Sequence, residues 1–399
     1  MYSWFLSIAA WLVASPMLLL FGVLLTELIL GAVPGRRGRA EALSFANALQ
    51  QLTVILMPAH NEAGGIGAII DSLQRQLPTT ARILVIADNC SDETATVARA
   101  HGAQVVERHD AERRGKGHAL AFGRDFLQAD PPKAVLVLDA DCTLGEGALA
   151  QLMSCAIEQQ RPVQGLYLLH ALPDAGPKVQ ISNFAFLIKN LVRQRGARRL
   201  HAPAILGGTG MAFPWRLFAT LPLATSDLVE DLALGIHCTR QGHQPRFVET
   251  AAIWSEAASE SDTIKQRARW EQGFLSTAMA HGLPLLREGM LRPSLLWMGL
   301  HLLVPPLALL FPLGFLTMAL LALIAAFGGG WVPFLVFTAE LLAVGLMIAA
   351  AWLLNGRDVI PAGTLLRVPL YILWKAGIYF RFFGRRGETE WVRTRRLGE

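Results

Sequence analysis

Hydrophobic positions gather in two long blocks near the ends of the chain, and short apolar runs lie between them. The first block, Ser3 to Gly35, holds one charged residue, Glu27. It is long enough to cross a bilayer core of ~30 Å, which needs about 20 apolar residues. Because it lacks a basic stretch in front and a convincing cleavage site, the pattern predicts a membrane anchor and not a removed signal peptide.

The second block carries no Asp, Glu, Lys or Arg between Pro293 and Ala339. Two adjacent prolines separate a predicted interfacial helix, residues 295–304, from a predicted span over residues 307–327. Three glycines at 328–330 predict a turn, after which residues 332–354 return across the membrane. This block therefore predicts two crossings, and the first block adds one more.

A last apolar segment, Ile360 to Phe380, is nearly long enough to cross, but it contains Arg367 and Lys375. A charge at the middle of a bilayer costs ~3 kcal/mol or more. We therefore expect an amphipathic helix that lies in the membrane interface here, and three crossings in all.

Between the two blocks, short apolar runs alternate with amphipathic stretches. The runs predict strands, and the stretches between them predict helices. The predicted strands are 53–57 (ended by Pro58), 82–86, 104–106 and a run that ends at Asp139, and the predicted helices are 65–77, 94–101 and 117–127. Continuous apolar strands separated by helices predict a mainly parallel sheet covered on both faces. In such sheets ligands bind beyond the carboxyl ends of the strands.

Composition supports a membrane protein, because 53% hydrophobic and 17% charged residues do not fit an ordinary soluble chain of 399 residues. The formal net charge of +5 comes largely from basic residues that flank the apolar blocks. These are Arg36, Arg37, Arg39, Arg381, Arg385, Arg386, Arg393, Arg395 and Arg396. By the positive-inside tendency, both flanks and the central region are cytoplasmic. This charge suits anionic lipid, and we do not expect nucleic-acid binding. The four cysteines form no C-x-x-C pair, so we expect free thiols.

Polar clusters follow the predicted strands. Asp139 and Asp141 lie on one side of an extended chain, where two carboxylates could hold Mg2+ or Mn2+ against a diphosphate. Taken alone, such a pair is more often a solvated acidic turn. Asp88 also follows a strand and could accept a hydrogen bond from a base or ribose. The residues after it, Ser91 or Asp92, could equally cap a helix.

Three further clusters carry candidate chemistry. Lys116 lies in a glycine-containing basic turn that enters a helix and favours phosphate, although a solvated turn is the simpler explanation. Glu230 and Asp231 begin another helix; Asp231 could act as a general base, and the second carboxylate could help to adjust its pKa. Adjacent acids are also favourable in any first helical turn.

Gln266, Arg269 and Trp270 share one helical face by their i, i+3, i+4 spacing. Arg269 could bind a diphosphate, Gln266 could donate to it, and Trp270 could stack on a sugar ring. An amphipathic helix with its tryptophan at the membrane interface explains Trp270 but not the Gln/Arg pair. We therefore favour a functional role for this cluster.

Together these residues resemble the family-two inverting glycosyltransferases of the GT-A fold, and within them membrane-integrated synthases of hyaluronan, chitin oligosaccharide, poly-N-acetylglucosamine and cellulose. The resemblance covers roughly residues 50–275 by motif. It implies an α/β GT-A domain with a mainly parallel sheet, plus transmembrane and interfacial α-helices at both ends. The implied organisation is an anchor at 1–35, a cytoplasmic transferase domain at 50–280, and C-terminal helices with a basic tail at 290–399.

The resemblance also assigns roles, residue by residue. Nucleotide-sugar binding is implied for Pro58, His60, Glu62, Asp88, Lys116, Asp139, Gln266 and Arg269. Acceptor binding is implied for Gly208, Thr209, Gly210 and Trp270, metal binding for Asp141 and Asp139, and catalysis for Asp231 with Glu230. Two departures are Asn89, where many relatives have Asp, and Cys142, where a small hydroxyl residue is frequent.

The activity implied is a single inverting displacement that requires Mg2+ or Mn2+. Asp231 would deprotonate an acceptor hydroxyl, which attacks a UDP-sugar at the cytoplasmic face of a bacterial plasma membrane. The implied acceptor is a growing polysaccharide or oligosaccharide. Two alternatives stay open: transfer of one sugar to a lipid, as in ceramide glucosyltransferase, and an inactive subunit that binds nucleotide sugar.

Overall fold

The computed structural model describes residues 2–35, 52–170, 175–225, 229–255 and 260–384 of the chain. Most of the basic flanks used above to predict orientation, Arg36, Arg37, Arg39 and those from Arg385 onward, lie outside these residues. The chain forms two compact units. Of the described residues, unit 1 comprises 2–34, 175–201 and 278–384, and unit 2 comprises 35, 52–170, 202–225, 229–255 and 260–277.

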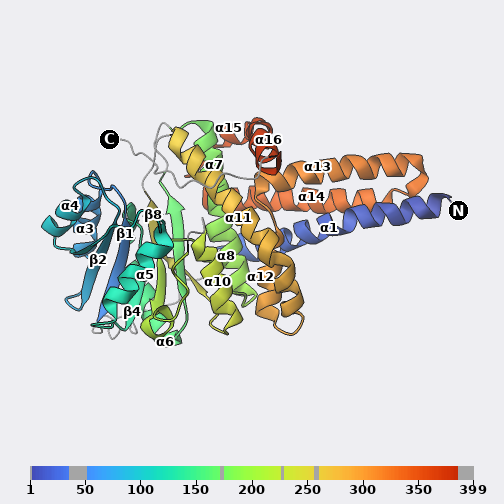
Figure 1. Cartoon of the computed structure of the whole chain (residues 1–399). Helices are drawn as coiled ribbons and strands as arrows, with labels where there is room; N and C mark the ends of the chain where they lie inside the picture. Colours follow the sequence, from blue (N-terminus) through green and yellow to red (C-terminus); the bar gives the residue numbers. More distant parts are fainter. Residues whose placement is uncertain (1, 36–51, 171–174, 226–228, 256–259, 385–399) are drawn as a thin grey trace. The chain divides into compact units, whose positions relative to one another are not determined.

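Unit 2 is built on an eight-stranded sheet of order β3-β2-β1-β4-β7-β6-β8-β5 (Figure 1). The strands are β1 (Thr53–Ala59), β2 (Ala81–Asp88), β3 (Gln104–Arg108), β4 (Ala134–Val137), β5 (Cys142–Leu144), β6 (Val163–Leu169), β7 (Met211–Pro214) and β8 (Arg246–Ser255). The first four strands pair in parallel, and so do β6 and β8. Strand β7 runs antiparallel to β4 and β6, and β5 runs antiparallel to β8. The predicted α/β fold with a mainly parallel sheet is confirmed.

Helices cover both faces of this sheet because its central strands are apolar on both sides. They are α3 (Ile66–Gln74), α4 (Thr94–Ala100), α5 (Lys116–Leu127), α6 (Ala148–Gln159), α9 (Trp215–Phe218) and α10 (Glu230–Arg240). Alternate residues of β1, such as Val54 and Leu56, pack with α5, α9 and α10 in one buried cluster. The residues between them, Ile55 and Met57, are equally buried. A strand buried on both faces reads as the continuous apolar run seen in the sequence.

The first strand does not end at Pro58, as the sequence predicted, but continues to Ala59. Only Thr53 to Leu56 pair with β4, whereas the whole strand pairs with β2. Proline lacks the N–H that a ladder on both sides would use. Pro58 is tolerated because it lies beyond the end of β4, where one side of the strand has no neighbouring ladder.

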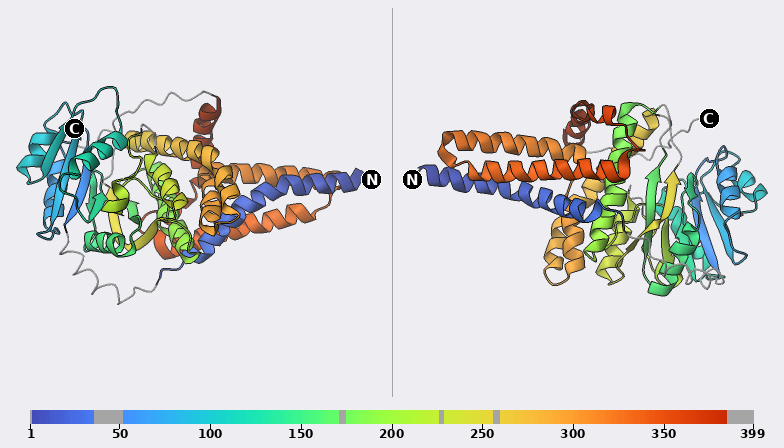
Figure 2. Two further views of the ribbon diagram at one scale, coloured as in Figure 1. Left: turned by 60° about the horizontal axis from the view of Figure 1, so that its bottom comes forward. Right: turned by 180° about the vertical axis from the view of Figure 1, so that it is seen from behind.

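Unit 1 contains three helices that, among the described residues, are long and apolar enough to cross a membrane: Ser3–Gly31, Leu307–Gly329 and Val332–Gly356. They correspond to α1 (Tyr2–Gly31), α13 (Leu307–Ile324) with η3 (Ala325–Gly329), and α14 (Val332–Ala351) with η4 (Trp352–Gly356). Figures 1 and 2 show α1, α13 and α14 lying side by side. Phe21 of α1 joins them through edge-on contacts with Phe311 and Phe337 at centroid distances of 5.8 and 5.7 Å.

The shorter helices of unit 1 include α7 (Pro177–Leu187), the π-helix η2 (Ile188–Arg193), α8 (Gln194–Arg199), α12 (Pro293–Leu303), α15 (Ala362–Leu365) and α16 (Val368–Gly384). A further helix, α11 (Glu260–Gly289), contributes residues to both units. Helices α8 and α12 run across the direction of the three long helices (Figures 1 and 2). The predicted single helix over residues 360–380 is instead two helices. The break falls before Pro369, which lies in the first turn of α16, where its missing N–H costs nothing.

The charge inside the first predicted span is buried and paired. Glu27 has no exposed surface; its Oε2 accepts from Arg193 Nε at 2.5 Å, and its Oε1 lies 2.6 Å from His301 Nδ1. One turn further on, Gly31 O accepts from Arg195 Nη1 at 2.7 Å. Glycines at positions 31 and 196 allow this approach, because a Cβ at either one would overlap the backbone of the other helix. The end of α1 is therefore held by the helical segment η2–α8, a contact that the sequence analysis did not predict.

Candidate active site

Two carboxylates follow β4 at the carboxyl edge of the sheet. The backbone N–H of Asp139 donates to Thr209 Oγ1 at 3.0 Å, which fixes the chain as it leaves the strand. Asp141 Oδ2 accepts from Ser255 Oγ at 3.3 Å, and its Oδ1 accepts from Cys142 Sγ at 3.2 Å. Ser255 is the last residue of β8 and pairs with Cys142. The position of Asp141 therefore depends on a strand more than a hundred residues later.

The residues at this edge fit a hard divalent cation. Ligand atoms of Asp139, Asp141 and Cys142 all lie within 4.8 Å of one another. Burial raises the pKa of the Cys142 thiol well above its ordinary value, and this thiol donates to Asp141. Carboxylate oxygens are the ligands that Mg2+ and Mn2+ prefer, and a neutral thiol is a poor one. The two aspartates are thus the groups that would hold the metal.

Lys116, the first residue of α5, connects three parts of the site. Its ammonium donates to the Asp139 carboxylate and, at 2.6 Å, to Gly208 O. Gly208 has a φ of +84°, and a Cβ placed there would lie 3.6 Å from Lys116 Nζ and 3.4 Å from Asp231 Oδ2. Burial alone would lower the pKa of Lys116, but Asp139, Glu230 and Asp231 outweigh it and raise the pKa above the ordinary range. Lys116 is therefore a fixed positive charge among carboxylates.

Glu230 and Asp231 occupy the first turn of α10, as the sequence predicted. Burial raises the pKa of Glu230 to about 7; Asp231 adds to this effect and Lys116 opposes it. Burial also lowers the pKa of Arg269, and Glu230 partly compensates, which places the two side chains within electrostatic reach. Arg269 lies on α11, together with Gln266 and Trp270, and all three are half-buried. Glu230 and Arg269 thus interact electrostatically although they belong to separate helices.

The glycine-containing loop before β7 is held by a buried glutamine that sequence reasoning missed. Gln164 of β6 accepts from Gly207 N at 2.8 Å and donates to Thr209 O at 3.0 Å. Gly210 has a φ of +65°, and a Cβ there would lie 2.5 Å from Ile253 Cδ1. The only signal in the sequence was a polar residue inside the apolar run of β6, which by itself does not indicate a partner.

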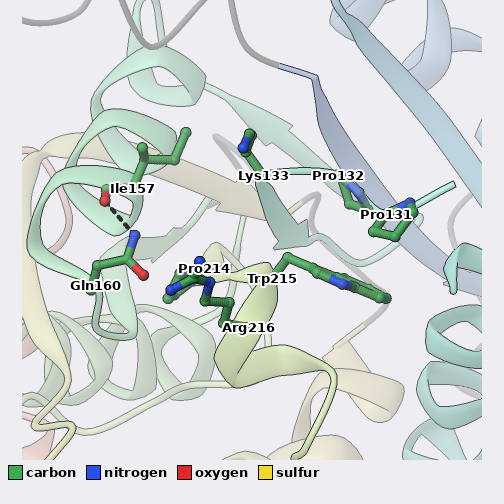
Figure 3. A pocket seen from close by; sticks show the side chains of 8 residues that line it. All are labelled: Pro131, Pro132, Lys133, Ile157, Gln160, Pro214, Trp215 and Arg216. Atoms are coloured by element: carbon green, nitrogen blue, oxygen red, sulfur yellow. Dashed lines mark hydrogen bonds between the residues drawn. The ribbon is translucent and has the colours of Figure 1, made fainter.

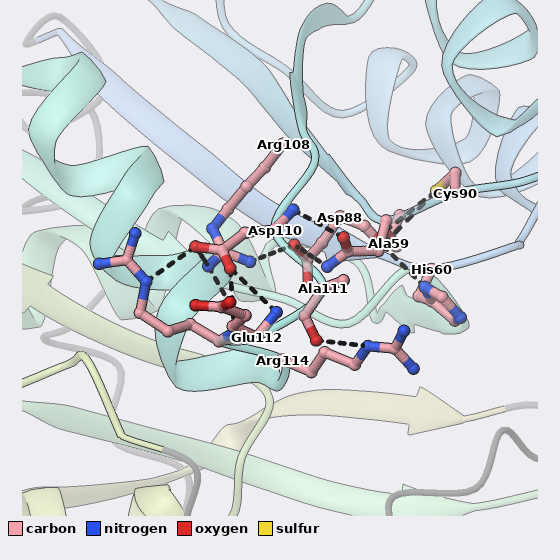
Figure 4. A network of polar contacts seen from close by, with 11 residues as sticks. Ala59, His60, Asp88, Cys90, Arg108, Asp110, Ala111, Glu112 and Arg114 are labelled. Carbon is pink, nitrogen blue, oxygen red and sulfur yellow. Dashed lines mark hydrogen bonds and ion pairs between the residues drawn. The ribbon is translucent and has the colours of Figure 1, made fainter.

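Asp88, the last residue of β2, lies in a second polar network at the same edge (Figure 4). Its Oδ1 accepts from Arg108 Nη1 at 2.6 Å and from Asn89 Nδ2 at 3.0 Å. Arg108 ends β3 and also donates to Asp110 Oδ2 at 3.1 Å and to Arg113 O at 2.7 Å. Sequence reasoning missed Arg108 because the predicted third strand stopped at residue 106. Arg108 thus links Asp88 to the loop that leads to α5.

Two asparagines with positive φ shape this network. Asn89, at φ 51°, donates to Asp88 and accepts from Asp110 N at 2.8 Å. An ionised aspartate could accept but not donate here, so these two hydrogen bonds fit asparagine at this position. Asn61, at φ 55°, accepts from Ser91 N at 2.7 Å. Asparagine is one of the non-glycine residues that adopt this conformation most readily.

The remaining predicted residues near β1 are in the same region. His60 Nδ1 donates to Asp88 O at 2.7 Å, because a carbonyl oxygen can only accept. The backbone N–H of Glu62 donates to Thr94 Oγ1 at 2.7 Å. Asp92 accepts from Thr94 N at 3.0 Å, but the residue that caps α4 is Glu93, which makes no side-chain cap hydrogen bond, so the predicted cap at Ser91 or Asp92 is wrong.

A cavity of about 480 Å³ lies at the other end of the strands, on the side where β4 begins (Figure 3). It is lined by Pro131, Pro132, Lys133, Ile157, Gln160, Pro214, Trp215 and Arg216. Lys133 directly precedes β4, whereas Asp139 and Asp141 follow it. This cavity is therefore separate from the carboxylates.

Residues 50–273 match the family described as Glycosyltransferase like family 2. Because this match covers more than half of the chain, the protein belongs to the family-2 glycosyltransferases. A mannosyltransferase from Pyrobaculum calidifontis, solved in complex with GDP-Man and Mn2+, superimposes with a TM-score of 0.50 at 18% identity, covering 85% of this chain and 99% of that chain. At this identity the likeness concerns the fold alone, and it confirms the GT-A fold with apolar helices.

Curated relatives match shorter stretches. An uncharacterized glycosyltransferase of Mycobacterium bovis is 35% identical over 120 residues, which cover 28% of this chain and 50% of the relative. The 4,4'-diaponeurosporenoate glycosyltransferase of Staphylococcus aureus is 40% identical over 109 residues, which cover 26% of this chain and 27% of the relative. The chain thus matches half or less of the length of these relatives.

Proposed function

We propose that this protein transfers a sugar from a UDP-sugar to an acceptor hydroxyl at a membrane surface, with inversion at the anomeric carbon. The observation that carries the proposal is that three carboxylates, those of Asp139, Asp231 and Glu230, surround Lys116. Asp141 lies beside this group, and Asp88 lies at the same end of the sheet. A scaffold that only binds nucleotide sugar needs no buried second carboxylate next to a candidate base. The inactive-subunit alternative therefore has less support.

The Asp88 network supports uracil as the base of the donor. Among the described residues, both side-chain donors to this carboxylate, Arg108 and Asn89, bind Oδ1. Oδ2 is then the oxygen available to a ligand. Uracil presents a single ring N–H, which one oxygen can accept, whereas guanine presents two neighbouring N–H groups that match both oxygens of a carboxylate. The geometry of Asp88 thus favours UDP over GDP.

The proposed chemistry assigns each remaining group a task. A divalent cation held by Asp139 and Asp141 would supply positive charge to the departing diphosphate. Asp231 takes the proton from the acceptor hydroxyl as that oxygen attacks. Glu230, whose pKa of about 7 keeps it partly protonated, limits the negative charge next to Asp231. Arg269, near Glu230, offers a further positive charge, and Gln266 and Trp270 share its helix.

Two acceptor classes follow from different observations. The motifs resemble those of polysaccharide synthases, which favours a growing glycan. The name of the staphylococcal relative indicates an apolar acceptor, and the described residues contain just three candidate spans, which favours a lipid. In either case we place the reaction at the cytoplasmic face of the plasma membrane, on the basis of the basic residues beside the apolar blocks.

The test uses purified protein in nanodiscs with Mn2+ or Mg2+, membrane lipids and radiolabelled UDP-glucose, UDP-N-acetylglucosamine, UDP-galactose or GDP-mannose. We expect transfer from a UDP-sugar, and the product's solubility and size identify a glycan or a lipid acceptor. Asp231→Asn should abolish transfer and retain UDP binding, because it removes the base and keeps the shape. Transfer by Asp231→Asn at the wild-type rate would refute the assignment of the base.

A further inference from the structure

Lys116 competes by its position with any cation that the two aspartates would hold. Its ammonium is bonded to the Asp139 carboxylate, which is also one of the two proposed metal ligands. The second proposed ligand, Asp141, is two residues away and adds negative charge beside Asp139. Two positive groups on one carboxylate repel each other strongly at distances of a few ångströms, and partial burial reduces the screening.

The same lysine is placed to bind phosphate. It begins α5, a helix of 12 residues, and Gly115 before it has a φ of +119°. The positive end of a helix dipole together with a lysine is a favourable environment for phosphate oxygens. A diphosphate next to Asp139 would therefore attract the ammonium and offer oxygens to the cation. Lys116 and the cation would then both bind the diphosphate, and their repulsion at the Asp139 carboxylate would be offset.

We propose that Lys116 makes divalent-cation binding depend on the nucleotide diphosphate, so that metal binds weakly to the protein alone and tightly together with the donor. The inference rests on the proposed function, because it needs the aspartates as metal ligands and a diphosphate as the shared partner. Lys116 acts here as a positioning residue. It holds the Asp139 carboxylate and Gly208 O, and its positive charge repels the incoming cation.

The experiment measures Mn2+ binding directly, by electron paramagnetic resonance of free Mn2+, with and without saturating UDP. The variants are Lys116→Met, Lys116→Arg and, as a matched control, Lys133→Met at the other end of the strands. In the wild type we expect UDP to tighten Mn2+ binding by about tenfold or more, the factor that ~1.4 kcal/mol provides. Lys116→Met should bind Mn2+ without UDP about tenfold more tightly than the wild type, and most of the UDP effect should disappear.

The remaining variants keep the inference falsifiable. Lys116→Arg, which retains the charge, should keep the dependence on UDP, and Lys133→Met should match the wild type. Equal Mn2+ affinity of Lys116→Met and wild type without UDP would overturn the inference and leave the metal site intact. If Asp141→Asn binds Mn2+ as well as the wild type, the metal assignment itself is wrong, and the inference falls with it.

Discussion

The buried carboxyl of Glu230 predicts how the stability of unit 2 changes with pH. In the folded protein its pKa is raised from 4.5 to about 7 by burial and by Asp231, although Lys116 opposes the shift. At ~1.36 kcal/mol per pKa unit, the folded state disfavours the ionised form by about 3 kcal/mol. A group whose pKa is raised on folding contributes stability that is fully present below its unfolded pKa and is lost as the pH rises through its folded pKa. The wild type should therefore lose up to about 3 kcal/mol between pH ~4.5 and ~8 from this group.

Glu230→Gln tests this argument, because glutamine keeps the shape and cannot ionise. The free energy of unfolding of the variant minus that of the wild type should therefore increase by up to about 3 kcal/mol as the pH rises from about 5 to about 8, because only the wild type loses this contribution. Thermal unfolding of protein in detergent, followed by circular dichroism at several pH values, measures the difference. Glu158→Gln on the exposed surface of α6 is the control and should follow the wild type. If Glu230→Gln shows the same pH dependence as the wild type, Glu230 is not protonated in the folded protein and the reasoning is wrong.

Two further substitutions test the site at other points. Arg108→Met should weaken UDP binding by about tenfold or more, because a buried carboxylate that loses its charged partner costs ~3 kcal/mol or more and Asp88 would move. Calorimetry measures the affinity, and unchanged binding would contradict the role given to Asp88. Gly210→Ala should lower the free energy of unfolding by ~2 kcal/mol or more, since a side chain at positive φ is strained and its Cβ would overlap Ile253. A melting temperature equal to that of the wild type would show that the loop before β7 can move aside.

The strands and helices of the first half of unit 2 could be predicted because their apolar runs are local and complete. Residues 53–57 and 83–86 are buried on both faces, so no register had to be known to recognise them. The antiparallel strands β5 and β7 could not be predicted in the same way. They have three and four residues, and their pairing depends on partners far along the chain. Short segments carry too little periodicity to distinguish a strand from a loop.

The site shows the same division. Asp139 and Asp141 could be placed together from the sequence because they follow the same strand. Asp88 could be placed near them because parallel strands have their carboxyl ends on the same side of the sheet. The network around Lys116 could not be derived, since it joins α5, the loop before β7 and the first turn of α10. Arg108 was missed for a simpler reason: its strand is half-exposed, and a charged residue at its end looked like the start of a loop.

The buried charge in the first helix has a consequence for how the chain must be made. Glu27 emerges from the ribosome early, but Arg193 lies 166 residues later and His301 lies 274 residues later. Until they are synthesised, the carboxylate of Glu27 has to remain near water or carry a proton, because an unpaired charge is costly in a bilayer. The sheet of unit 2 is complete once β8 has been made, before His301 appears. Synthesis of the chain thus has an inherent order, in which unit 2 can fold first and the end of the first helix that carries Glu27 is secured last.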